Sequence, residues 1–258
     1  MPTTTTPDGV SIDYSVTGAG PPLVLVHGIT EGRAAWDPLL PDLAADHTVV
    51  AIDMRGHGGS GLAASYDAQS MADDVATVVA ELGLEAPLAI GHSMGGIVVT
   101  AFAGVHPCRG VINIDQSIAL GDFQDLVVGA ETLLRGDEFE GVLGALFESM
   151  NGALPADEVA RVAALRRPVQ EVVLGVWAPL LEMMPADLQA LVDSLASAVT
   201  APYLALHGIN PGPAYATWLR AAIPTASVEV WEDIGHYPHL VHPQRFLDRV
   251  RAFEATLA

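Results

Sequence analysis

Short apolar runs alternate with longer helix-like stretches over most of this 258-residue chain, and the alternation limits the folds it can adopt. Six runs have the length and the Val, Leu and Ile content of buried strands: 22–26, 48–52, 88–90, 110–114, 202–206 and 227–231. Helix-like stretches lie at 34–45, 70–82, 94–106, 213–222 and 240–257. This order predicts an α/β fold with a mostly parallel central sheet flanked by helices. Residues 9–17 alternate in polarity, as in an exposed antiparallel strand or hairpin at a sheet edge.

The alternation stops between residues 117 and 198, where helix-like segments follow one another without a strand. We expect residues 117–198 to form a helical cap inserted after the sixth strand, and residues 1–116 and 199–258 to form the core. Apolar and adaptable side chains in or near the cap are expected to line a substrate pocket. They are Trp36, Ile118, Phe147, Met150, Trp177 and Met184.

The charge of the chain excludes some partners. It carries 31 acidic residues against 11 basic ones, all Arg, for a formal net charge of −20, and no basic run could neutralise phosphates. We therefore expect no nucleic-acid partner. The longest apolar run, 172–181, is too short to span a bilayer and contains Pro179, so no membrane association is expected.

Two further features bear on location and chemistry. The first eight residues lack the basic and apolar segments of a secretory signal, which predicts a cytoplasmic location. Cys108 is the only cysteine, so it cannot form an internal disulfide, and a structural role is expected for it.

The segment from Gly91 to Gly95 has the pattern of a nucleophile elbow, a tight turn from a strand into a helix. Ser93 lies at its centre, with glycines two residues before and two after it, where such a turn leaves little room for side chains. The turn would expose the Ser93 hydroxyl and direct backbone N–H groups toward a developing oxyanion.

The run 22–26 leads into His27, Gly28 and Ile29, a glycine-containing loop at the carboxyl edge of the sheet. The expected oxyanion-hole donors are the backbone N–H groups of Ile29 and Met94. The alternative is that this loop is only a turn that ends the strand.

His236 is the expected general base, because it lies on a loop between the last strand and the last helix and can reach toward Ser93. The other histidines fit less well. His92 would point away from the elbow, and His239 and His242 fall at the start of the last helix.

Four segments together resemble the α/β-hydrolase superfamily: Val26-His27-Gly28, the stretch 53–60, the elbow with Gly96, and Gly235-His236-Tyr237-Pro238. Within it, the chain looks like the small capped esterases, cofactor-free haloperoxidases and carbon–carbon bond hydrolases. A serine at the elbow argues against the dehalogenases and epoxide hydrolases, which carry aspartate there. The stretch 53–60 lacks the features of a phosphate or metal loop and is interpreted as a structural turn.

The resemblance also shows that this chain lacks an acidic residue at the family's usual position for the orienting acid. The family's usual orienting acid follows the strand at 202–206, but no Asp or Glu occurs between residues 194 and 228. Some members place the acid after the preceding strand, where this chain has Asp115. Asp115 is therefore the expected third member of the triad. Asn210 as a neutral orienter, a cap acid such as Asp122, and a dyad without a third residue are the alternatives.

These features predict a serine hydrolase that cleaves a small to medium apolar carboxylic ester or lactone through an acyl-enzyme. The substrate would be a small molecule, with no cofactor and no metal, and the chain is compatible with a homo-oligomer. The alternatives use the same triad for carbon–carbon bond hydrolysis or for perhydrolase and haloperoxidase chemistry, or bind a ligand with the triad nearly silent.

Overall fold

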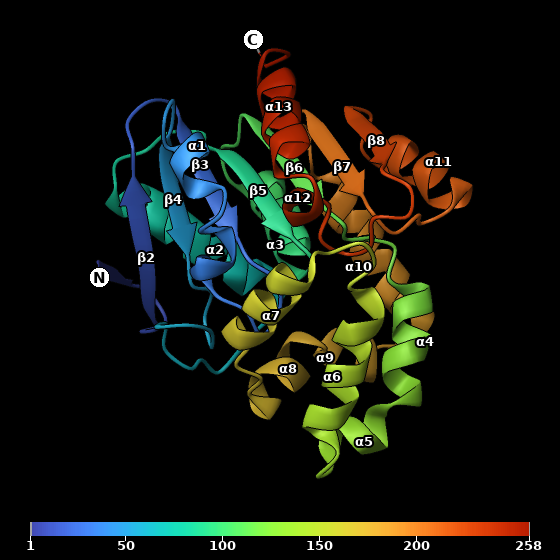
Figure 1. Cartoon of the computed structure of the whole chain (residues 1–258). Coiled ribbons are helices and arrows are strands. Elements are labelled where there is room, and N and C mark those ends of the chain that lie inside the picture. Colours follow the sequence, from blue (N-terminus) through green and yellow to red (C-terminus); the bar gives the residue numbers. More distant parts are fainter. Residues whose placement is uncertain (1, 258) are drawn as a thin grey trace.

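The computed structural model describes residues 2–257, in which eight strands form one sheet in the order β1-β2-β4-β3-β5-β6-β7-β8 (Figure 1). The strands are β1 (Thr3–Thr5), β2 (Ser11–Thr17), β3 (Pro22–Val26), β4 (Thr48–Ile52), β5 (Leu88–His92), β6 (Gly110–Ile114), β7 (Tyr203–His207) and β8 (Ala226–Val230). Strand β2 pairs antiparallel with β1 and β4, and every other pair is parallel. The predicted mostly parallel sheet is confirmed.

The centre of the sheet is buried on both faces. Every residue of β5, β6 and β7 is buried, as expected for parallel strands covered by helices. Successive side chains of β3 belong to different cores, because side chains alternate between the faces of a strand. Val24 and Val26 join one core with helices α2 (Ala68–Glu81) and α3 (Met94–Val105). Leu23 and Leu25 join the other with helix α13 (Pro243–Glu254).

Prolines divide two stretches that the sequence predicts as single helices. The stretch 34–45 contains a 3-10 turn, η1 (Arg33–Trp36), and one short helix, α1 (Leu40–Leu43), with Pro41 in its first turn. The stretch 240–257 contains α12 (Pro238–Val241) and α13, separated at His242. His242 has φ −130° and ψ 67°, because a residue before proline is disfavoured in the helical region.

Between β6 and β7 the chain forms only helices, and α4 to α9 gather below the sheet in Figure 1. They are α4 (Gly121–Gly129), α5 (Glu131–Arg135), α6 (Phe139–Met150), α7 (Ala156–Leu165), α8 (Gln170–Val176), α9 (Ala178–Glu182) and α10 (Pro185–Ser197). After β7 the chain forms α11 (Pro213–Ala222) and returns to the sheet at β8. The helical segment 117–198 therefore follows the sixth strand.

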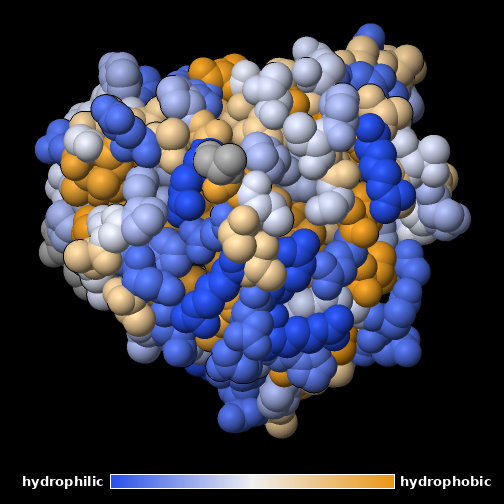
Figure 2. Space-filling model, turned by 90° about the horizontal axis from the view of Figure 1, so that it is seen from above, coloured by the Kyte–Doolittle hydropathy of each residue, from blue (hydrophilic) through white to orange (hydrophobic). Residues whose placement is uncertain are grey.

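Figure 2 shows a face of the molecule on which hydrophilic residues predominate and hydrophobic residues form small, separate groups. Within residues 2–257, every helix falls short of the length and apolar content that a bilayer span needs.

Candidate active site

Ser93 lies on a sharp turn between β5 and α3, with φ 52° and ψ −126°. A non-glycine residue at positive φ costs about 1–3 kcal/mol and persists only where its surroundings enforce it. Here the flanking glycines do so. A Cβ atom on Gly91 would lie 2.0 Å from the Gly95 carbonyl oxygen, and one on Gly95 would lie 2.2 Å from the Val26 carbonyl oxygen. The turn therefore requires both glycines.

His236 and Asp115 form a buried hydrogen-bonded pair. The His236 Nδ1–H donates to Asp115 Oδ2 over 2.6 Å. The other carboxylate oxygen, Oδ1, accepts the backbone N–H groups of Gly208 (2.7 Å) and Ile209 (2.8 Å). Burial alone would raise the pKa of the Asp115 carboxyl, but the bond and charge of His236 and the two N–H groups outweigh it and hold the pKa below its usual value. Asp115 is therefore a carboxylate at neutral pH.

The backbone around His236 is held from two sides. Its N–H donates to the Met150 carbonyl oxygen (2.9 Å), and its own carbonyl oxygen accepts from His92 Nε2 (2.8 Å). Burial, followed by the neighbouring imidazoles of His236 and His239, holds the pKa of His92 well below its usual value, so His92 stays neutral. This neutral ring fixes the loop without adding a charge to the site.

Ser93 and His236 line the same cavity. With Nδ1 bonded to Asp115, Nε2 is the ring nitrogen that can exchange a proton with the Ser93 hydroxyl. The hydrogen bonds of residues 2–257 include none between that hydroxyl and the imidazole. Such bonds often tighten only when substrate binds.

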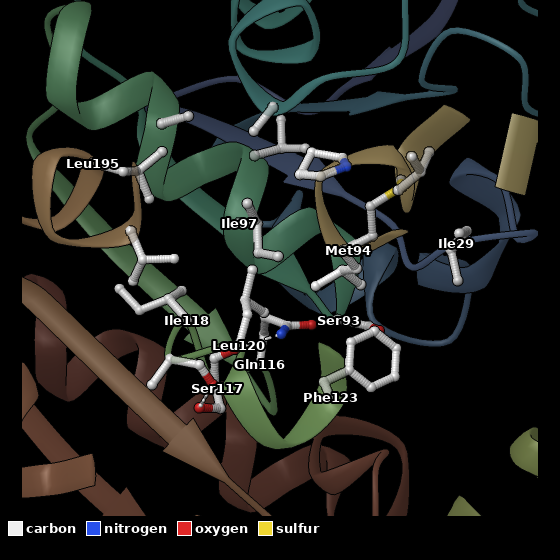
Figure 3. Close-up of a pocket in the computed structure, with 18 of the residues that line it drawn as sticks. Ile29, Ser93, Met94, Ile97, Gln116, Ser117, Ile118, Leu120, Phe123 and Leu195 are labelled. Atoms are coloured by element: carbon white, nitrogen blue, oxygen red, sulfur yellow. Dashed lines mark hydrogen bonds between the residues drawn. The ribbon is translucent and has the colours of Figure 1, made fainter. Parts of the chain in front are cut away.

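The loop after β3 passes beside Ser93, since a Cβ atom on Gly28 would lie 3.3 Å from the Ser93 Cβ. A hydrogen bond from the Glu31 N–H to the Gly28 carbonyl oxygen (3.2 Å) closes the turn. Ile29 and Met94 both line the cavity (Figure 3). Met94 is the first residue of α3, so its N–H has no partner within the helix.

The helical segment contacts this loop through a chain of polar groups. Arg166 donates to the Tyr237 hydroxyl (2.8 Å), which donates to Glu31 Oε1 (2.9 Å). The Arg167 N–H donates to the Thr30 carbonyl oxygen (2.7 Å). Because Tyr237 follows His236 directly, these bonds connect the helical segment with both sides of the site. Sequence reasoning missed them, since no motif marks the partners.

The cavity has a volume of about 600 Å³, within the range of small-molecule sites. Of the six residues expected in the pocket, Ile118, Phe147, Met150 and Trp177 line it.

The other two expectations are wrong. Trp36 is 1% exposed and packs in the core with α13, its ring centroid 5.2 Å from that of His239, because η1 directs it inward. Met184 precedes α10 and is 68% exposed.

Sequence reasoning also missed His207, which ends β7 and lines the cavity. Burial lowers the pKa of His207 to about 4, so the ring is neutral. Its buried Nε2 has no hydrogen-bond partner among the described residues. Its position at the carboxyl end of a central parallel strand was the signal that could have identified it.

The alternatives to Asp115 are less well placed. Asn210 is exposed, and its amide donates to Glu232 Oε1 (3.1 Å) rather than to His236. Asp122 lines the cavity but is exposed.

The turn 53–60 uses its acidic side chain within the fold. The Asp53 carboxylate accepts the backbone N–H groups of Arg33 (2.6 Å) and Gly59 (3.0 Å). No group of three or more metal-ligating side chains occurs within residues 2–257.

Comparison with known proteins identifies the family of the chain. Residues 21–205 match the family model described as alpha/beta hydrolase fold, and the chain belongs to that family. An esterase from Rhodococcus sp. ECU1013 is 28% identical, with a TM-score of 0.74 over 100% of this chain and 99% of that one.

Two further relatives are similar over nearly their whole lengths. A thermophilic esterase from Thermogutta terrifontis is 25% identical, with a TM-score of 0.76 over 99% of this chain and 97% of that one. The pimeloyl-[acyl-carrier protein] methyl ester esterase of Cronobacter sakazakii is 27% identical over 262 residues, 95% of this chain and 97% of the relative. The chain is therefore a hydrolase of the esterase-like kind.

Proposed function

We propose that this hydrolase is serine-dependent and cleaves apolar carboxylic esters or lactones through an acyl-enzyme, with Ser93 as nucleophile, His236 as base and Asp115 as orienting acid. The observation that carries the proposal is the 2.6 Å His236–Asp115 pair in the cavity that also contains the elbow serine. The three esterase relatives support the reaction class.

Each step of the mechanism follows from this arrangement. Ser93 Oγ attacks the carbonyl carbon while His236 Nε2 takes its proton, and the Asp115 carboxylate stabilises the imidazolium. The N–H groups of Ile29 and Met94 stabilise the oxyanion. His236 then gives the proton to the leaving alkoxide, the C–O bond breaks, and the alcohol departs. Water, deprotonated by His236, attacks the acyl-enzyme, and the acid leaves as Ser93 regains its proton.

The helical segment 117–198 would act as a cap over a core of residues 1–116 and 199–258. Phe147, Met150 and Trp177 come from it and line the cavity that Ser93 also lines. Their apolar surface suits an apolar ester more than a peptide or polysaccharide. The mechanism uses only side chains and backbone groups of this chain and requires no cofactor.

Replacing the nucleophile tests the proposal. Ser93→Ala should lower the kcat for p-nitrophenyl butyrate by roughly 10⁴-fold or more and abolish labelling by a fluorophosphonate probe. Ser11→Ala, at an exposed position in β2, is the matched control and should leave both readouts unchanged. Undiminished turnover in Ser93→Ala, or failure of the native protein to be labelled, would contradict serine dependence.

A further inference from the structure

The cavity does not end at Ser93 but continues along helix α3. The residues of α3 that line it recur at helical spacing and form one stripe from the first residue of the helix to the last. They are Met94, Ile97, Val98, Ala101, Gly104 and Val105. All six are apolar, so the side chains of this wall offer no hydrogen-bond partner to a polar group.

Helix α10 supplies the facing wall with the same spacing. The residues that line the cavity from it and from its C-terminal cap are Leu188, Leu191, Val192, Ser194, Leu195 and Ala198, of which only Ser194 is polar. In Figure 3, Leu195 and Ile29 lie on opposite sides of Ser93, so the stripe leads away from the oxyanion loop. The two walls are close at the far end, where a Cβ atom on Gly104 would lie 3.1 Å from the Ala198 Cβ.

The length of this passage indicates how long a carbon chain it can hold. From Met94 to Val105 the helix rises about 16 Å, at 1.5 Å per residue. An extended chain advances about 1.2 Å per backbone bond, so the passage matches roughly a dozen carbons.

The position of the proton donor determines which part of an ester lies in the passage between α3 and α10. The leaving oxygen must receive its proton from His236, so the leaving group lies beside His236, whose partner Asp115 also accepts the N–H of Ile209, another residue that lines the cavity. Ile209 is 45% exposed, which allows an alcohol to depart. The passage between α3 and α10 is then left for the acyl group.

We propose that the groove between α3 and α10 binds the unbranched acyl chain of the substrate, with roughly eight to twelve carbons. This inference rests on the proposed ester hydrolysis and narrows its substrate class. A straight chain fits, because a groove walled by two facing helices along its whole length has no room for a branch near Gly104.

A chain-length series tests the groove. The native protein should give its highest kcat/KM for p-nitrophenyl esters of eight to twelve carbons. Ala101→Leu, which adds three carbons halfway along the stripe, should lower that value at least tenfold for decanoyl and dodecanoyl esters. The ratio of kcat/KM for the decanoyl ester to kcat/KM for the acetyl ester should therefore fall at least tenfold, because an acetyl group is too short to reach residue 101. Ala221→Leu, the same change at an exposed position of α11, is the matched control and should keep the native profile.

A cooperative urea-unfolding transition close to that of the native protein would show that Ala101→Leu folds. If it does not fold, Leu195→Phe, at a half-buried position on the facing wall, replaces it with the same expectation. An unchanged chain-length profile in the folded variant overturns the proposal. So does a length optimum that follows the alcohol part in alkyl acetates instead of the acyl part.

A binding measurement tests the groove independently of ester hydrolysis. Ser93→Ala should bind methyl decanoate in a calorimetric titration, and adding Ala101→Leu should weaken that binding at least tenfold. Hydrolysis of esters by the native protein without such binding would reject the groove and leave the proposed function standing. Binding without hydrolysis of any ester would reject the function and retain the groove.

Discussion

At the scale of single residues, Asp115 adopts φ 49°, a region that Asp and Asn enter more readily than most residues. This conformation directs the carboxylate toward the loop after β7, where Gly208 and Ile209 donate to one oxygen while His236 donates to the other. In this chain the loop after β7 therefore holds the hydrogen-bond donors of the acid and not the acid itself. The carboxylate has come from the neighbouring strand, but the imidazole still has an anionic partner.

Asp115→Ala should lower kcat by roughly 10⁴-fold, because the His236 ring loses both its orientation and the charge that stabilises the imidazolium. Asn210→Ala should leave kcat within about twofold, since its amide is directed at Glu232. Steady-state hydrolysis of p-nitrophenyl butyrate by the two variants measures both effects. The reverse pattern would place the orienting group on the loop after β7.

At the scale of elements, the elbow depends on how closely β5, α3 and the loop after β3 approach one another. The Gly95 Cα lies against the Val26 carbonyl, and a Cβ on Gly96 would lie 2.3 Å from Asn113 Oδ1. Helix α3 can begin at Met94 only if its first turn carries no side chains toward β3 and β6. The glycines at 95 and 96 are therefore required by the packing of α3 against these two strands.

Gly95→Ala should destabilise the protein by at least about 3 kcal/mol, since the added Cβ would lie 2.2 Å from backbone oxygen that cannot move independently. Gly144→Ala, in exposed α6 with open space around the new Cβ, should instead stabilise it by about 0.5–1 kcal/mol. Urea unfolding of both variants measures the difference. Equal stability of the two would contradict the close packing described for the elbow.

At the scale of the whole molecule, the fold buries several histidines in their neutral form. Burial lowers the pKa of His207 to about 4 and the pKa of His239 to about 3, against an ordinary value of 6.5. Below pH 6.5 the unfolded chain binds protons that the folded protein does not. The stability that these groups contribute is therefore complete above pH 6.5 and is lost as the pH falls toward 4.

The free energy of unfolding should decrease on acidification from pH 6.5 to 4, with each such histidine contributing about 1.4 kcal/mol per pH unit. His207→Phe should reduce this slope by the equivalent of about one proton. Tyr215→Phe, which alters the ring packed on His207 at 5.2 Å without removing the imidazole, should retain the native slope. Urea unfolding at several pH values gives the slopes, and stability independent of pH over this range would refute the expectation.

The amino-acid sequence by itself determined the features that depend on neighbouring residues: the order of strands and helices, the parallel sheet, the elbow glycines and the position of Asp115 after a strand. Hydrophobic periodicity and turn geometry are local, so they can be read along the chain. The breaks at His242 and before Pro41 follow from proline and could also have been predicted.

Only the tertiary structure decided which apolar side chains face the cavity. Trp36 and Trp177 are both large, apolar and buried, yet one packs in the core behind the sheet and the other lines the cavity. The Arg166–Tyr237–Glu31 contacts and the groove between α3 and α10 likewise join residues far apart in the chain. The physical reason is that the direction of a buried side chain depends on how its element packs, and packing is a property of the assembled fold.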